Sequence, residues 1–175
     1  MNQSDNVERY AASWVFPYLQ SLHPDYCVRP VPDNIHAQHR YGDKWLASAK
    51  HKHAMEWELK AEEKHTGNLF IETWSDIRSG VHGWLYHYSD AARLAYAFND
   101  QHRLYTCRIG ELRRWAHSAT GESAIRIESF RPVEQSKYQQ RNVTVGRLVP
   151  VNVFLEEVNG AECHVVEEAV HGTHP

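Results

Sequence analysis

The strongest constraint on the fold is a run of alternating residues from Met55 to Glu62. Apolar residues occupy positions 57, 59 and 61, and charged residues occupy positions 56, 58, 60 and 62. Side chains of a strand point to opposite faces with a period of two, so the pattern predicts a strand over Ala54–Ala61 with one apolar face and one charged face. A second apolar and aromatic run, Asn68–Trp74, follows after a polar loop and predicts a second strand.

The remaining patterns place helices beside further strands. Apolar residues recur at three- and four-residue steps from Asp5 to Leu22, which predicts a helix that Pro17 kinks or ends near Phe16. Further expected helices are 89–98 and 110–119, with a helical turn at 154–158, and further expected strands are 44–48, 104–109, 124–130 and 143–151. This order predicts an α/β domain with a mixed β-sheet flanked by helices.

Length and composition suit one domain. With 175 residues and 42% apolar content, we expect a single α/β domain over residues 1–158 and a loosely held acidic tail over 159–175, whose 163–166 run could form a short strand. No apolar run approaches the ~20 residues that a membrane span needs, and the N-terminus lacks the pattern of a signal peptide. Cys27, Cys107 and Cys163 are widely spaced, which favours ordinary thiols in a reducing cytoplasm.

Charge is unevenly distributed along the chain. The net charge is −3, but residues 78–147 hold 11 Lys or Arg against 6 Asp or Glu, and residues 148–175 hold five Glu and no Lys or Arg. Arg103, Arg108, Arg113 and Arg114 would form a basic strip across a strand and a helix, which could contact DNA. The alternative is an ordinary solvated exterior of mixed charge.

One group of residues suits phosphodiester chemistry. Mg²⁺ needs only a few carboxylates besides a substrate phosphate. Asp43, at the start of one predicted strand, and Glu58, in the middle of the next, can converge across a hairpin at ~5 Å, with the Leu59 carbonyl beside them. Lys60, on the same face as Glu58, could orient the attacking water or stabilise developing negative charge. The alternative is an exposed Glu58–Lys60 ion pair worth under ~1 kcal/mol, and Glu62 is expected to face solvent.

Asp43 followed by Glu58-Leu59-Lys60 resembles the signature of the PD-(D/E)XK nuclease superfamily, in which an acid on one strand meets Glu-x-Lys on the next. The run from Glu58 to Trp84 is similar to small phage and mobile-element proteins of that superfamily. The resemblance implies a restriction-endonuclease-like fold and a cytoplasmic endonuclease that hydrolyses DNA with Mg²⁺, for which Mn²⁺ substitutes. It also allows a homodimer, because nucleases of this type often need two copies to cut both strands.

Three further acids enter as lesser candidates. A helix bearing Glu8 fits the arrangement in archaeal-type Holliday-junction resolvases, where an early helix gives a further acid. Glu72 lies in an apolar run, where a carboxylate is costly unless exposed or paired, so it is a candidate for a supporting role near the metal. Asp33 follows Pro32 and matches the literal Pro-Asp motif better than Asp43 does, but it lies 25 residues before Glu58. Asp43 is therefore preferred as the first metal ligand.

Two other classes of function stay open. The chain could keep the nuclease fold without turnover and bind branched DNA or a protein partner, which the acidic C-terminus would suit. The 13 histidines include close pairs at 36 and 39, 51 and 53, and 171 and 174, which leaves a histidine-bound zinc or nickel protein as a third reading.

Overall fold

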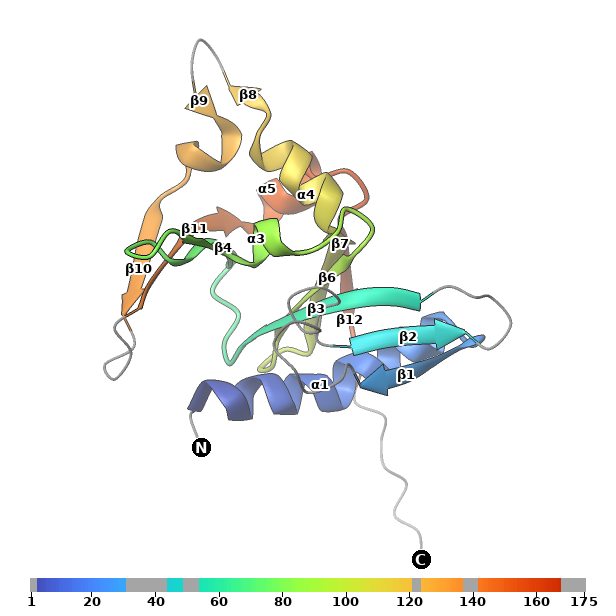
Figure 1. Ribbon diagram of the computed structural model, residues 1–175. Coiled ribbons are helices and arrows are strands. Elements are labelled where there is room, and N and C mark those ends of the chain that lie inside the picture. Colours follow the sequence, from blue (N-terminus) through green and yellow to red (C-terminus); the bar gives the residue numbers. More distant parts are fainter. Residues whose placement is uncertain (1–2, 31–43, 49–53, 121–123, 137–141, 168–175) are drawn as a thin grey trace, which may run out of the picture.

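The computed structural model describes residues 3–30, 44–48, 54–120, 124–136 and 142–167, and it shows a mixed α/β fold (Figure 1). The expected α/β class is confirmed. Within these ranges none of the helices is both long and apolar enough to cross a membrane. The helices are α1 Gln3–Leu22, α3 Trp84–His87, α4 Ile109–Ala116 and α5 Val151–Glu157, with a 3-10 helix, η1, at Arg126–Ser129.

The larger sheet has the strand order β1-β2-β3-β6-β7-β12. Its strands are β1 Tyr26–Pro30, β2 Lys44–Ser48, β3 Ala54–Glu62, β6 Arg93–Phe98, β7 Arg103–Arg108 and β12 Glu162–Val165. The strands β3 and β6 run parallel, whereas every other neighbouring pair in this sheet is antiparallel. The sheet is therefore mixed, as expected.

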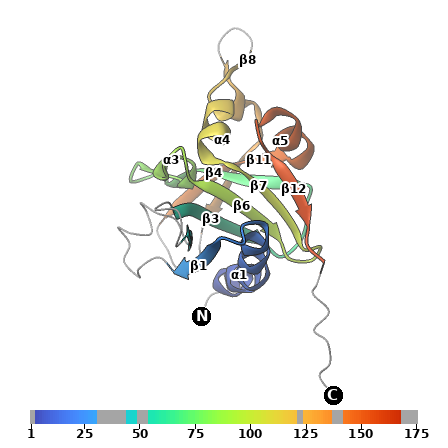
Figure 2. The ribbon, with the colours of Figure 1, turned by 90° about the vertical axis from the view of Figure 1, so that its right-hand side faces the viewer.

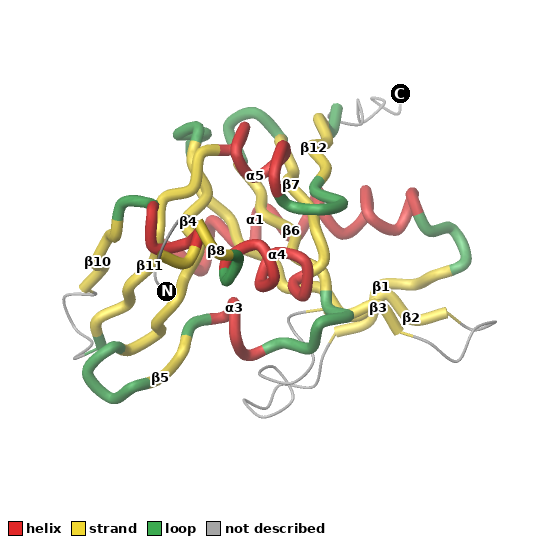
Figure 3. Tube along the Cα trace, turned by 90° about the horizontal axis from the view of Figure 1, so that it is seen from above, coloured by secondary structure: helices red, strands yellow, loops and turns green. Residues whose placement is uncertain are grey.

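A second, antiparallel sheet has the order β10-β11-β4-β5. Seen from above, it lies on one side of the molecule, and β1, β2 and β3 lie on the other (Figure 3). Parallel strands need a crossover connection, and here the chain passes from β3 to β6 through β4, β5 and α3. The remaining strands are β4 Asn68–Asp76, β5 Val81–His82, β10 Pro132–Ser136, β11 Val143–Pro150 and the small pair β8 Ala119–Thr120 and β9 Ala124–Ile125.

Two apolar clusters lie on the two faces of the larger sheet. Helix α1 covers one face, on the side away from α4 and α5 (Figure 2), and its Val15 and Leu19 share a cluster with Trp57 and Leu59 of β3. The other face belongs to the main core, which joins residues of the second sheet, α4 and α5. Because Trp57 and Leu59 point toward α1, the alternating charged residues of β3 point toward the main core.

Pro17 lies inside α1 and does not end it. A proline removes one backbone hydrogen bond within a helix. Phe16 and Leu19, on either side of it, are 4% and 1% exposed, and Pro17 itself is exposed. Burial of the neighbouring apolar side chains against the sheet offsets the lost bond, so the helix continues to Leu22.

Two expected elements are wrong. The predicted helix at 89–98 is instead strand β6, because residues 94–98 are all buried and a run that is apolar on both faces fits a central strand as well as a helix. The predicted strand at 124–130 ends at Ile125, where η1 begins.

The tail expected from residue 159 starts as part of the sheet. Its residues 162–165 form β12, which pairs with β7, as the sequence allowed for the 163–166 run. The end of that expected tail, 168–175, lies outside the described residues.

Candidate functional site

Glu58 and Lys60 form an ion pair on the inner face of β3. Lys60 Nζ lies 2.7 Å from Glu58 Oε1, and the side chains are 29% and 2% exposed. Their register partners on β6 are Tyr96 for Lys60 and Leu94 for Glu58, and both partners belong to the main core. The predicted common face is confirmed, but the alternative of an exposed ion pair is wrong for Glu58.

The burial of Glu58 works against folding. Moving a carboxylate out of water costs several kcal/mol, and a nearby cation recovers only part of that free energy. Replacing both members of such a pair by apolar side chains of similar volume is often neutral or stabilising. A buried charged group of this kind is a candidate for function.

The same face of β3 carries two further carboxylates. Ser89 Oγ donates a hydrogen bond to Glu56 Oε2 at 3.2 Å. The Tyr96 hydroxyl donates a hydrogen bond to the Glu62 carboxylate, and its oxygen accepts a 2.9 Å hydrogen bond from the Phe70 backbone N–H. The expectation that Glu62 faces solvent is therefore wrong, because it is partly buried against the tyrosine.

Protonation at Glu62 and Tyr96 follows from this burial. Burial raises the pKa of the Glu62 carboxyl, and the hydrogen bond from Tyr96 acts in the opposite direction. Burial first, and then the charge of Glu62, raises the pKa of Tyr96 well above its usual value, so the tyrosine remains a donor at neutral pH. At ~3.3 Å per residue, Glu62 is about 13 Å along the strand from Glu58. The two carboxylates therefore cannot share one ion.

The other half of the expected metal site is only partly described. Strand β2 pairs antiparallel with β3, with Lys44 opposite Trp57. Asp43, Asp33 and the histidine pairs at 36 and 39, 51 and 53, and 171 and 174 lie outside the described residues. The Leu59 side chain packs toward α1, so only its carbonyl could be a ligand. Among the described residues, no three His, Cys, Asp or Glu side chains are grouped to hold a metal ion.

The two lesser acids do not join this pair. Glu72 lies on β4 in the second sheet, where it accepts a hydrogen bond from the Ser75 hydroxyl. Its neighbours Ile71 and Thr73 are buried on one face of the second sheet, so Glu72 points to the other face of that sheet. Glu8 is exposed on α1, and α1 covers the face of the larger sheet that Glu58 does not occupy.

The expected basic strip is divided by local contacts. Arg113 lies 2.5 Å from Asp90 and donates hydrogen bonds to the carbonyls of Leu85 and Tyr88 near α3. Arg114 pairs with Glu111 within α4 at 2.5 Å. Both arginines therefore have intramolecular partners, whereas Arg108, at the end of β7, is exposed.

Comparisons with protein-family models, curated proteins and solved structures found no match to this chain.

Proposed function

We propose that this chain is a Mg²⁺-dependent endonuclease of restriction-endonuclease-like fold that hydrolyses phosphodiester bonds in DNA. The observation that carries the proposal is the buried Glu58–Lys60 ion pair, 2.7 Å long, on a strand that pairs with the strand after Asp43. A mixed sheet with a helix on one face supports the fold assignment without being specific to it.

The register of β2 and β3 favours Asp43 as the second acid. Lys44 is opposite Trp57, Trp45 is opposite Glu56, and the pairing continues without a shift. Asp43 directly precedes Lys44 in the sequence and lies outside the described residues. We assign it as the second acid because it is one residue from the end of this pairing, whereas Asp33 is eleven residues before Lys44.

The donor set fits a hard divalent ion. Mg²⁺ prefers carboxylate and carbonyl oxygens and keeps several waters, so two carboxylates with the Leu59 carbonyl suffice. Such an ion supplies charge neutralisation and a more acidic bound water. Lys60 is the more exposed member of the ion pair, and we assign it the contact with the attacking water or with the negative charge that develops on the phosphate. Glu58 holds the ammonium of Lys60 in place.

Nicking of supercoiled plasmid with Mg²⁺ or Mn²⁺ tests the proposal. We expect Lys60→Ala, Glu58→Gln and Asp43→Asn each to lower the rate by about 10²-fold or more, because each removes a group that acts on the transition state. Lys64→Ala and Glu63→Gln are matched controls at exposed positions, and they should retain the wild-type rate. Wild-type nicking no faster than that of folded Lys60→Ala refutes the catalytic assignment.

The near-complete burial of Glu58 favours one second candidate, a module that keeps the fold without turnover and binds DNA or a protein partner. A catalytic carboxylate must reach its substrate, and the Glu58 side chain is only 2% exposed. Mn²⁺ binding, measured by calorimetry, separates the two. If the chain is a nuclease, the wild type should bind Mn²⁺ and Glu58→Gln should abolish this binding. If the chain is an inert module, the wild type should show no such binding.

A further inference from the structure

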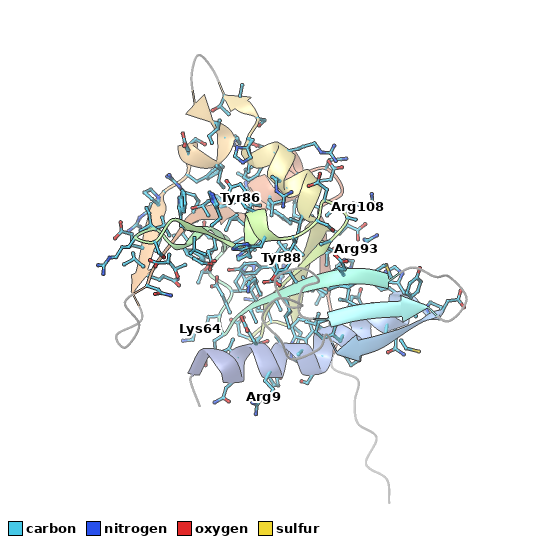
Figure 4. The ribbon with its side chains drawn as sticks, viewed as in Figure 1. Arg9, Lys64, Tyr86, Tyr88, Arg93 and Arg108 are labelled. Atoms are coloured by element: carbon cyan, nitrogen blue, oxygen red, sulfur yellow. The ribbon has the colours of Figure 1, made fainter. Side chains whose placement is uncertain are left out.

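Two arginines face each other on the larger sheet. Arg93 of β6 and Arg108 of β7 are directly opposite in the antiparallel register, so their side chains share one face. Like charges in that position are destabilising. Figure 4 labels both arginines at one end of the sheet, away from Lys64. Because the pairing disfavours the folded state, a compensating interaction is expected.

Arg93 lies partly inside the protein. It is opposite Trp57 of β3, and its guanidinium carbon lies 5.6 Å from the centroid of the Trp57 ring. Burial lowers the pKa of Arg93, the charge of Arg108 lowers it further, and Glu162 and Tyr26 act in the opposite direction. The aromatic contact stabilises the cation only in part.

Two carboxylates, Glu111 and Glu162, lie near these arginines and also contact other residues. Over the described ranges, neither Arg93 nor Arg108 forms a salt bridge. Glu111 pairs with Arg114 at 2.5 Å, and Glu162 lies 3.3 Å from His164 Nε2. The two guanidinium groups therefore have donors available for an external anion.

A cavity of ≈ 230 Å³ opens beside these groups. Its lining includes Arg93 and Arg108, the carboxylates of Glu111 and Glu162, and Thr106 and Gly160. Thr106 shares the face of Arg108 because the two are two residues apart on β7. The volume is several times the ≈ 30 Å³ that one water molecule occupies in the liquid. Guanidinium forks match phosphate oxygens with paired hydrogen bonds.

We propose that Arg93 and Arg108 bind a phosphate group in this cavity, on the face of the larger sheet opposite Glu58. The bound group is inorganic phosphate, the phosphate of a nucleotide or a phosphate of a DNA backbone. The two arginines would recognise the phosphate oxygens in the same way in all three. The site goes beyond the proposed nuclease function and does not depend on it, because none of its residues belongs to the Glu58–Lys60 pair.

The test is an NMR titration of backbone amides in which chloride is replaced by inorganic phosphate at constant ionic strength and pH. Saturable shifts are expected at Arg93, Arg108 and Gly160. Arg108→Ala should weaken binding at least about tenfold, as expected for loss of a charged hydrogen-bond donor. Glu162→Gln should strengthen binding, because it removes a negative charge from the cavity, and Lys64→Ala should leave it unchanged.

Parallel titrations with a nucleoside monophosphate and with a short DNA duplex identify the source of the phosphate. Arg93→Lys provides a second variant that keeps the charge but loses the planar fork, and it should also bind more weakly. Shifts that spread evenly without saturation, or equal binding by wild type and folded Arg108→Ala for all three ligands, overturn the proposal. Because the readout is binding without metal, its outcome is separate from that of the plasmid assay.

Discussion

Replacing Lys60 by methionine would remove an ammonium group that lies 2.7 Å from a carboxylate with 2% exposure. Methionine keeps the apolar stem and a similar volume, so the change is mainly electrostatic. Removing one partner of a buried ion pair typically costs 3–5 kcal/mol. Because Lys60 is 29% exposed, solvent weakens the pair, and we expect a loss of about 3 kcal/mol. For a chain of this size, that lowers Tm by about 6–12 °C.

Urea unfolding followed by tryptophan fluorescence measures this loss, and a double-mutant cycle isolates its cause. Lys60→Met combined with Glu58→Met removes both charges, and the double variant should return to within about 1 kcal/mol of wild type. Lys64→Met, at an exposed position on the following loop, should change stability by less than about 0.5 kcal/mol. A loss below about 1 kcal/mol for Lys60→Met would mean that the pair behaves as a surface ion pair, and the reasoning from burial would fail.

Two further predictions concern the second sheet. A Cβ at Gly83 would lie 2.6 Å from the Glu72 carbonyl carbon, so Gly83→Ala should cost about 1–3 kcal/mol in urea unfolding, and unchanged stability would contradict that close approach. The hydrogen bond from the Ser79 hydroxyl, with backbone N–H groups of Val143, Arg78 and Ser79, lowers the pKa of Asp76 against the effect of burial. A carboxyl whose pKa is lowered in the folded protein stabilises the fold at pH values above its unfolded pKa of about 4. This stabilisation is lost as the pH falls through the folded pKa. Asp76→Asn should therefore be less stable than wild type at pH 7, and the two stabilities should converge toward pH 2, whereas a constant difference across this range would contradict the assignment.

The strands around the candidate site were predictable from local sequence. The strands expected at 44–48, 54–61 and 68–74 are confirmed as β2, β3 and β4. The run 54–61 alternates with a period of two, and the other two are short apolar runs next to turn residues or a polar loop. Strand β6 was not predictable in this way. Its residues 94–98 are all buried, so neither the helical nor the strand period is marked.

The site was predictable only in its local part. Alternation places Glu58 and Lys60 on one face, and the structure confirms it. The burial of Glu58 depends on β6, which begins more than thirty residues later and lies beside β3. The Glu62–Tyr96 hydrogen bond, between residues 34 positions apart, was missed for the same reason. The pairing of Asp43 with Glu58 stays a prediction.

The crossover between β3 and β6 ties the two sheets together. Strand β4 belongs to that crossover, yet it pairs with β11, whose residues 143–150 come from the far end of the chain. Cutting the backbone anywhere between β4 and β11 would leave neither of the two larger sheets complete in one fragment. A piece lacking β11 would expose a long strand edge prone to association. The chain should accordingly melt as one cooperative unit, and split or truncated versions should be recovered as aggregates.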